Sequence, residues 1–143
     1  MQDAHDLNLV IEAGIPLVAL ETWDEPRAID LLLRLARQRN SSLFQWSVTD
    51  GLKRGGFGLQ IEQSAKHSKP EDILDYLKHR AEPGIYALCD FHPWFGEEHP
   101  KHTRQLKDIA LRHNGGSITI VLVSHRLTLP PELSRLSARF QIS

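Results

Sequence analysis

The sequence has little of several residue types that mark special classes of protein. Cys89 is the single cysteine among 143 residues, so an internal disulfide is excluded. No apolar run approaches the roughly 20 residues that a membrane-spanning helix needs. The N-terminus also lacks the basic start and apolar core of a secretion signal. From these absences we expect a cytoplasmic protein with no membrane partner.

The sequence also lacks an excess of charge of either sign. It has 17 Lys and Arg residues against 18 Asp and Glu residues, and its formal net charge is −1. Proteins that bind nucleic acid need basic groups to neutralise phosphates, so we expect no nucleic-acid partner. Apolar residues make up 41% and charged residues 24%, which is typical of a globular chain. We predict one domain across residues 1–143.

What the sequence does contain is an alternation of apolar runs and amphipathic segments. Short continuous apolar runs predict buried strands at 15–21, 84–90 and 117–124. Two further strands are predicted at 42–48 and 139–143. Amphipathic or capped patterns predict helices at 6–14, 24–40, 68–82, 101–116 and 129–136. This order predicts an α/β fold, a three-layer sandwich with a mostly parallel five-stranded sheet.

Two local features set finer expectations for this fold. Residues 49–68 contain four glycines and no clear periodicity, and they are typical of a long loop or a loose hairpin. Ser68 and Glu71 have the spacing of a capping box. We therefore expect the helix of this region to begin at Ser68.

The turn after the first predicted strand, "ETWDEPRA" (residues 21–28), bears on phosphate binding. A P-loop at this place has glycines whose amides cradle phosphates, followed by a lysine and a hydroxyl. This turn has no glycine and no lysine, and Pro26 has no N–H to donate. Glu21, Asp24 and Glu25 place carboxylates where phosphates would lie. The sequence therefore predicts that this turn does not bind a triphosphate.

Asp90 ends the third apolar run, within "YALCDFHPWF" (residues 86–95). In P-loop enzymes an aspartate at this position holds Mg²⁺, and an acidic residue beside it often positions the attacking water. Here Phe91 follows, so the second acid is missing. We favour a structural role in which Asp90 accepts N–H bonds from the turn that follows.

Three histidines near this strand end raise the possibility of a metal site. His92, His99 and His102 lie close together in the sequence, and imidazoles suit zinc and similar metals. No recognised spacing such as H-E-x-x-H is present. A small metal-binding protein or hydrolase that uses Asp90 and these histidines is therefore the alternative hypothesis. We predict no catalytic residue and no bound cofactor in this chain.

The three tryptophans fall at or beyond predicted strand ends, at Trp23, Trp46 and Trp94. Most tryptophans pack in a core, but partly exposed ones often anchor a protein partner. We predict that Trp46, Asp50, His92 and Trp94 form a partner-contact surface at the strand ends.

Three stretches, "FQWSVTDGL", "YALCDFHPWF" and "IVLVSHRLTLPPELSRL", together resemble the N-terminal domain of a family of AAA-type ATPases. These ATPases are encoded in algal chloroplast and cyanobacterial genomes and occur in other bacteria. The likeness runs through nearly the whole chain, from "DLNLVIEAGIPLV" to "RFQI". It implies a P-loop-NTPase-like topology that lacks a P-loop, with a degenerate nucleotide site. It also implies that Asp90 has the position of a Walker B aspartate, and Ser124 that of a sensor residue.

The resemblance further implies an intact ATPase module, C-terminal to this domain, that binds ATP and magnesium. Combined with the missing phosphate cradle, it predicts a non-catalytic N-terminal regulatory or assembly domain of an AAA ATPase. The expected partners are its own C-terminal module, neighbouring subunits and a possible client protein.

Overall fold

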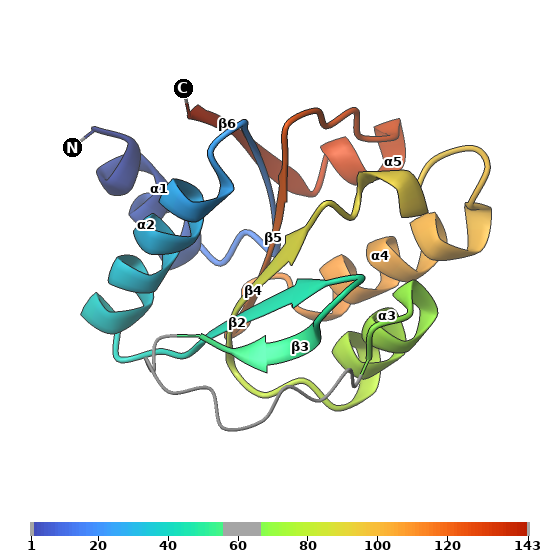
Figure 1. The fold of residues 1–143 in the computed structure, drawn as a ribbon, viewed down its shortest axis with the longest axis horizontal. Helices are drawn as coiled ribbons and strands as arrows, with labels where there is room; N and C mark the ends of the chain where they lie inside the picture. The colour runs from blue at the N-terminus through green and yellow to red at the C-terminus, as the bar shows by residue number, and fades with distance from the viewer. Residues whose placement is uncertain (1, 56–66, 143) are drawn as a thin grey trace.

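Six strands pair into one sheet between two layers of helices (Figure 1) in the computed structural model, which describes residues 2–55 and 67–142. The strands are β1 (Leu17–Thr22), β2 (Leu43–Ser47), β3 (Gly51–Arg54), β4 (Gly84–Cys89), β5 (Ile118–Ser124) and β6 (Ser137–Ile142). The helices are α1 (Gln2–Glu12), α2 (Glu25–Gln38), α3 (Pro70–His79), α4 (Pro100–Arg112) and α5 (Pro131–Ser134), with a 3₁₀ turn η1 (His92–Trp94).

The strand order is β3-β2-β4-β5-β1-β6, and every pairing except β2 with β3 is parallel. Each parallel neighbour is reached through a helical crossover, as the alternation of apolar runs and helices requires. The predicted α/β sandwich with a mostly parallel sheet is confirmed. The first strand lies inside the sheet, between β5 and β6, so its carboxyl end has a neighbour on each side.

The strand β3 is the one element that the sequence did not predict as a strand. It pairs antiparallel with β2, from Phe44 opposite Arg54 to Ser47 opposite Gly51. The sequence signal is weak because the strand has four residues and most of its side chains are only partly covered. A hairpin is thus present, but its first strand is β2 and only its second strand lies within residues 49–68. The rest of this stretch, residues 56–66, lies outside the described residues.

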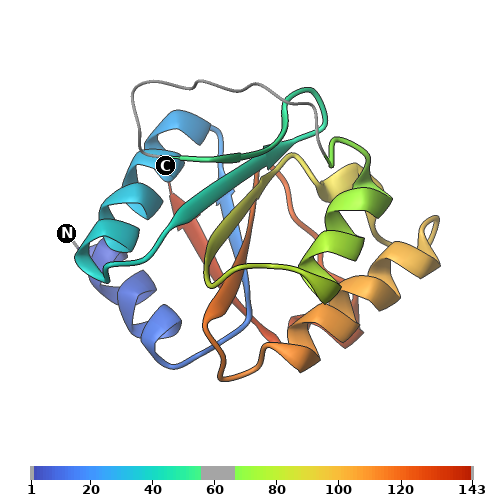
Figure 2. The same ribbon diagram turned by 90° about the horizontal axis from the view of Figure 1, so that it is seen from below.

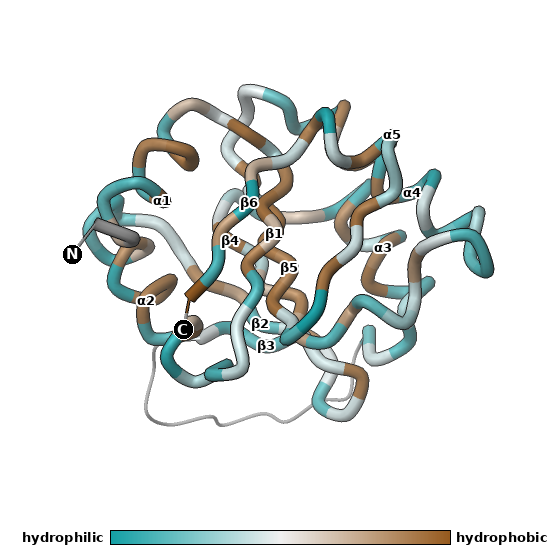
Figure 3. The backbone as a smooth tube through the Cα atoms, turned by 90° about the horizontal axis from the view of Figure 1, so that it is seen from above, coloured by the Kyte–Doolittle hydropathy of each residue, from teal (hydrophilic) through white to brown (hydrophobic). Residues whose placement is uncertain are grey.

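The central strands β4 and β5 are buried on both faces, as their continuous apolar sequences predict. The helices α1 and α2 cover one face, and α3, α4 and α5 cover the other (Figure 2). The most hydrophobic segments therefore gather in the middle of the fold (Figure 3). Each large apolar side chain that is fully buried contributes roughly 1.5–3 kcal/mol to folding.

The helices α2 and α3 begin in two different ways. The helix α2 is capped by the side chain of Asp24, whereas α3 begins at Pro70 with Lys69 as an N-cap that makes no side-chain cap bond. The predicted capping box at Ser68 is therefore wrong. Proline fixes the φ angle that the first helical position needs, so Pro70 sets this helix start. None of the described helices has the length and apolar character needed to cross a membrane.

Candidate functional site at the carboxyl ends of the strands

The carboxyl ends of β1 and β5 form the point where the chain turns to opposite faces of the sheet. The strand β1 continues into α2 on one face, and the neighbouring β5 leads to α5 on the other. Open α/β sheets bind their ligands outside such a switch point, because the two diverging connections leave a crevice there. The residues at this point show what kind of site the chain has.

The turn from β1 to α2 consists of Trp23 and Asp24 alone. The Asp24 carboxylate accepts a hydrogen bond from the Arg27 N–H at 3.2 Å, and the Asp24 N–H donates to Thr22 Oγ1 at 3.0 Å. An anion at a helix N-terminus would need these amide donors. The helix is instead capped by its own carboxylate, as the sequence predicts for Asp24, and Pro26 contributes no donor.

Glu21 lies at the end of β1 but is directed toward β6 and the segment after β5. Its Oε2 accepts hydrogen bonds from the Leu127 N–H at 3.0 Å and from Arg139 Nη2 at 3.1 Å. Its Oε1 accepts one from Gln141 Nε2 at 3.0 Å. The Leu127 amide, then Gln141 and Arg139, stabilise the ionised form and lower the pKa of Glu21. This carboxylate is a structural tie, because its hydrogen-bond partners lie on β6 and on the segment after β5.

Three aromatic rings, Trp23, His125 and His92, form a row across the ends of β1, β5 and β4, which we call the aromatic row. Trp23 stacks on His125 with ring centroids 4.6 Å apart and an interplanar angle of 28°. His125 meets the edge of His92 at 5.2 Å and 85°. Trp23 is nevertheless 85% exposed. The switch point therefore presents an exposed indole that stacks on a neighbouring imidazole.

The sequence identified Trp23 as a strand-end tryptophan but did not predict its role in this row. The signal was present, since both Trp23 and His125 come directly after a predicted strand. Their pairing was not predictable without the strand order, because β1 and β5 are far apart in the chain and adjacent only in the sheet.

His92 contributes the inner ring of the aromatic row. Burial lowers its pKa, the nearby His125 and Arg126 lower it further, and Asp90 opposes them. Its Nδ1 is buried and has no hydrogen-bond partner among the described residues. The protonated form of His92 is therefore disfavoured in the folded state.

Asp90 is exposed and adopts a left-handed backbone conformation with φ 54°. Its N–H donates to the Val123 carbonyl at 2.9 Å, which extends the pairing of β4 with β5. No described residue donates a hydrogen bond to its carboxylate, so the predicted capping of the following turn is wrong. Aspartate suits this position because it tolerates the left-handed region better than most residues.

Two further polar residues at the strand ends are buried. Ser124, which the resemblance places near a sensor position, is 3% exposed, and its Oγ has no partner among the described residues. Cys89 ends β4, and burial, followed by the influence of Glu25, raises the pKa of its thiol. The Cys89 sulfur is thus protonated and unsuited to nucleophilic chemistry.

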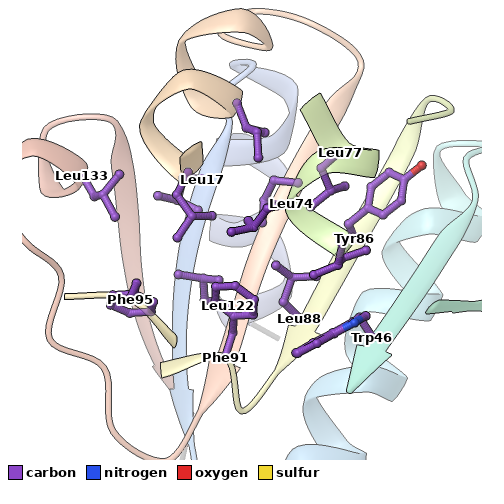
Figure 4. Packing of buried hydrophobic residues seen from close by; sticks show 14 of the residues in the cluster. Leu17, Trp46, Leu74, Leu77, Tyr86, Leu88, Phe91, Phe95, Leu122 and Leu133 are labelled. Carbon is purple, nitrogen blue, oxygen red and sulfur yellow. The ribbon is translucent and has the colours of Figure 1, made fainter. Parts of the chain in front are cut away.

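The predicted contact residues separate into two groups. Trp46 is fully buried, and its ring packs against Phe91 with ring centroids 5.3 Å apart (Figure 4). Its indole N–H donates to the His67 carbonyl. The prediction of Trp46 as a surface residue is therefore wrong. Its strand position directs it into the layer beneath α3 and α4. Asp50 is exposed, and its Oδ2 lies 3.4 Å from Lys53 Nζ. His92 and Trp94 are partly buried.

The structure does not bring together the predicted histidine cluster. His99 and His102 stack at 5.3 Å, and His102 Nδ1 lies 2.7 Å from the Trp94 carbonyl, while His92 belongs to the aromatic row. Within residues 2–55 and 67–142, no three His, Cys, Asp or Glu side chains are arranged to hold a metal ion. The alternative hypothesis of a metal site built on Asp90 and these histidines has no geometric support.

Comparisons with known proteins give matches along the whole described chain. Residues 3–142 match the family described as the N-terminal domain of SpoVK-like AAA ATPases. An uncharacterized AAA domain-containing protein, ycf46 of Guillardia theta, is 25% identical to the chain over 142 residues. This match covers 94% of the chain and 26% of the relative, so the chain spans about a quarter of that protein's length.

Proposed function

Because this chain belongs to the family of SpoVK-like AAA ATPase N-terminal domains, we propose that it is a non-catalytic regulatory or assembly domain of such an ATPase. ATP and magnesium then bind in a module C-terminal to this domain, and hydrolysis takes place there. The domain contacts that module, a neighbouring subunit or a client protein. The observation that carries this proposal is the capped turn between β1 and α2.

The backbone N–H groups of that turn are not arranged to bind a triphosphate. A phosphate cradle needs several backbone N–H groups that converge on one anion. Here Asp24 caps the helix, and Pro26 has no N–H. An N-cap contributes about 0.5–2 kcal/mol, so a phosphate would have to displace a stabilising carboxylate and then meet its charge. This supports a domain that does not bind nucleotide.

The aromatic row supports protein contact as the use of the same surface. An exposed tryptophan that is already stacked loses little freedom on binding, and tryptophans are among the residues that dominate binding energy at interfaces. Val48, after β2, is a second large apolar side chain that is exposed near a strand end, at 47%. We propose Trp23, His92 and His125 as the centre of the contact surface. Asp50 and Trp94 are retained as contact residues, and Trp46 is removed.

Isothermal titration of this chain with ATP and Mg²⁺ tests the non-catalytic role. We expect no saturable heat up to millimolar nucleotide, while the full-length ATPase binds under the same conditions. Micromolar binding to this chain alone would contradict the proposal. Titration of a Trp23→Ala variant in parallel tells whether such binding uses the switch point.

A further inference from the structure

A groove lies between α4 and the segment that connects β5 to α5, and we call it the α4 groove. Its volume is about 810 Å³, within the range of roughly 300–1,000 Å³ that is usual for ligand sites. The residues that line it are Gly96, Glu97, Pro100, Thr103, Arg104, Lys107 and 128–132. None of the rings of the aromatic row lines it, so it is separate from the proposed contact surface.

One wall of the α4 groove is a stripe along α4 that contains two cations, Arg104 and Lys107. They are one helical turn apart and therefore share a face. Arg104 Nε lies 3.1 Å from Asp108 Oδ1, and the Arg104 side chain is 64% exposed. The Lys107 ammonium has no carboxylate partner among the described residues. This wall can therefore receive a carboxylate from a ligand.

The opposite wall is extended and mostly apolar, and it is formed by Thr128, Leu129 and Pro130. Pro130 has φ −56° and ψ 150°, a polyproline-like conformation. Within the part of the chain that the structure describes, the backbone groups of Thr128 and Leu129 form no hydrogen bond. An extended peptide can pair with such a segment as an added strand does. This wall favours a peptide over a compact small molecule.

Two carboxylates, Glu97 and Glu132, also line the α4 groove. They repel a ligand with many negative charges, which disfavours nucleic acid and polyacidic tails. A ligand with one carboxylate can still reach Arg104 and Lys107, because the two cations are adjacent on α4. The charges of the lining thus select for a single acid.

We propose that the α4 groove binds an extended protein segment in which an apolar side chain lies next to a single Asp or Glu. The carboxylate of the segment contacts Arg104 and Lys107, and its apolar side chain packs on Leu129 and Pro130. Its backbone pairs with that of Thr128 and Leu129. This recognition is independent of the aromatic row and goes beyond the proposed ATPase role.

Selection of short random peptides displayed on phage against this chain tests the proposal. We expect the enriched peptides to share an apolar residue beside one Asp or Glu. Synthetic copies should bind at least about tenfold more weakly to Arg104→Glu/Lys107→Glu, a loss of ~1.4 kcal/mol. They should bind unchanged to Lys101→Glu/Arg112→Glu, whose charges lie on the same helix outside the groove, and to Trp23→Ala.

Amide chemical shifts of the wild-type protein give a second readout that does not depend on the stability of a variant. We expect the peptide to shift the Thr128 and Leu129 amides most. Failure to enrich any peptide, equal binding to both charge-reversed variants, or shifts confined to other regions would overturn the proposal. Loss of binding to Trp23→Ala alone would place the peptide on the aromatic row instead. None of these outcomes alters the nucleotide titration, so the two proposals fail separately.

Discussion

Two tryptophans near the carboxyl ends of parallel strands have opposite surroundings. Trp46 lies within β2, is fully buried and has its N–H bonded to the His67 carbonyl. Trp23 lies one residue beyond β1, is 85% exposed and stacks on His125. The position at a strand end does not decide exposure. A residue inside the strand is covered by the helices of one face, whereas a residue in the turn beyond it lies outside both layers.

The difference gives the two strand ends different roles. The end of β2 completes the core beneath α3 and α4, where Trp46 packs with Phe91. The end of β1 carries an apolar ring into solvent, although exposing so large a side chain forgoes burial energy. Substitutions at these positions can therefore test whether one residue serves folding and the other serves contact.

Trp46→Ala is expected to have the largest effect on stability. The loss of a fully buried indole removes its transfer energy and leaves a cavity, which costs about 3–5 kcal/mol. Urea denaturation monitored by circular dichroism measures the change. Trp46→Phe should cost less, since it keeps most of the volume but loses the bond to the His67 carbonyl. A loss below about 1 kcal/mol for Trp46→Ala would show that the residue is not in the core.

Glu21→Gln should have an intermediate effect, because Glu21 ties the end of β1 to its neighbours. Its carboxylate accepts three hydrogen bonds, and its side chain is 22% exposed, so we expect a loss of about 1 kcal/mol at pH 7. Asp30→Asn, which breaks an exposed ion pair with Arg34, is the control and should be nearly neutral.

The effect of Glu21→Gln should also depend on pH. The folded state lowers the pKa of Glu21, so its stabilisation is present above the unfolded value of about 4.3. It is lost as pH falls through the folded value. The stability difference between wild type and Glu21→Gln should therefore narrow as the solution becomes acidic. A difference that stays constant with pH would contradict the account of Glu21.

His92 should give a smaller effect, again with a defined sign. Its lowered folded pKa means that the unfolded chain binds a proton more readily, so stability should decrease as pH falls below about 6.5. His92→Gln should remove this part of the pH dependence. Titration of the histidine ring protons by NMR measures the pKa directly, and a value above the ordinary range would contradict the burial of this ring.

Trp23→Ala should have the smallest effect on stability, within about 0.5 kcal/mol, since little of its surface is covered. The same urea denaturation experiment used for Trp46→Ala measures it. Leu111→Ala, another exposed apolar residue at 51% on α4, is the matched control. If Trp23→Ala lowered the free energy of unfolding as much as Trp46→Ala, the proposed difference between the two strand ends would be wrong.

The sequence predicts those parts of the fold that depend on local patterns. The continuous apolar runs locate β1, β4 and β5, and the acidic residues of the turn before α2 predict the carboxylate cap that Asp24 forms. The short strand β3 was not predicted as a strand because its side chains are only partly covered. β3 pairs with β2 through backbone hydrogen bonds, and these leave little periodic pattern of apolar side chains in the sequence.

The candidate site was less predictable because it depends on which strands are neighbours. Trp23 and His125 come together only through the adjacency of β1 and β5. The exposure of Trp46 was predicted wrongly because its last-but-one position in β2 looks like a strand end in the sequence. The layer beneath α3, which no local pattern reveals, decides that the ring is covered.

Site-specific photocross-linking in the full-length protein that we propose tests the central claim most directly. The photoreactive residue p-benzoylphenylalanine in place of Trp23 is compared with the same residue in place of Lys101, an exposed position on α4. We predict efficient cross-links from position 23 to the ATPase module or a neighbouring subunit, and few from position 101. No cross-link from position 23, or equal yields from both positions, would contradict a contact surface built around Trp23.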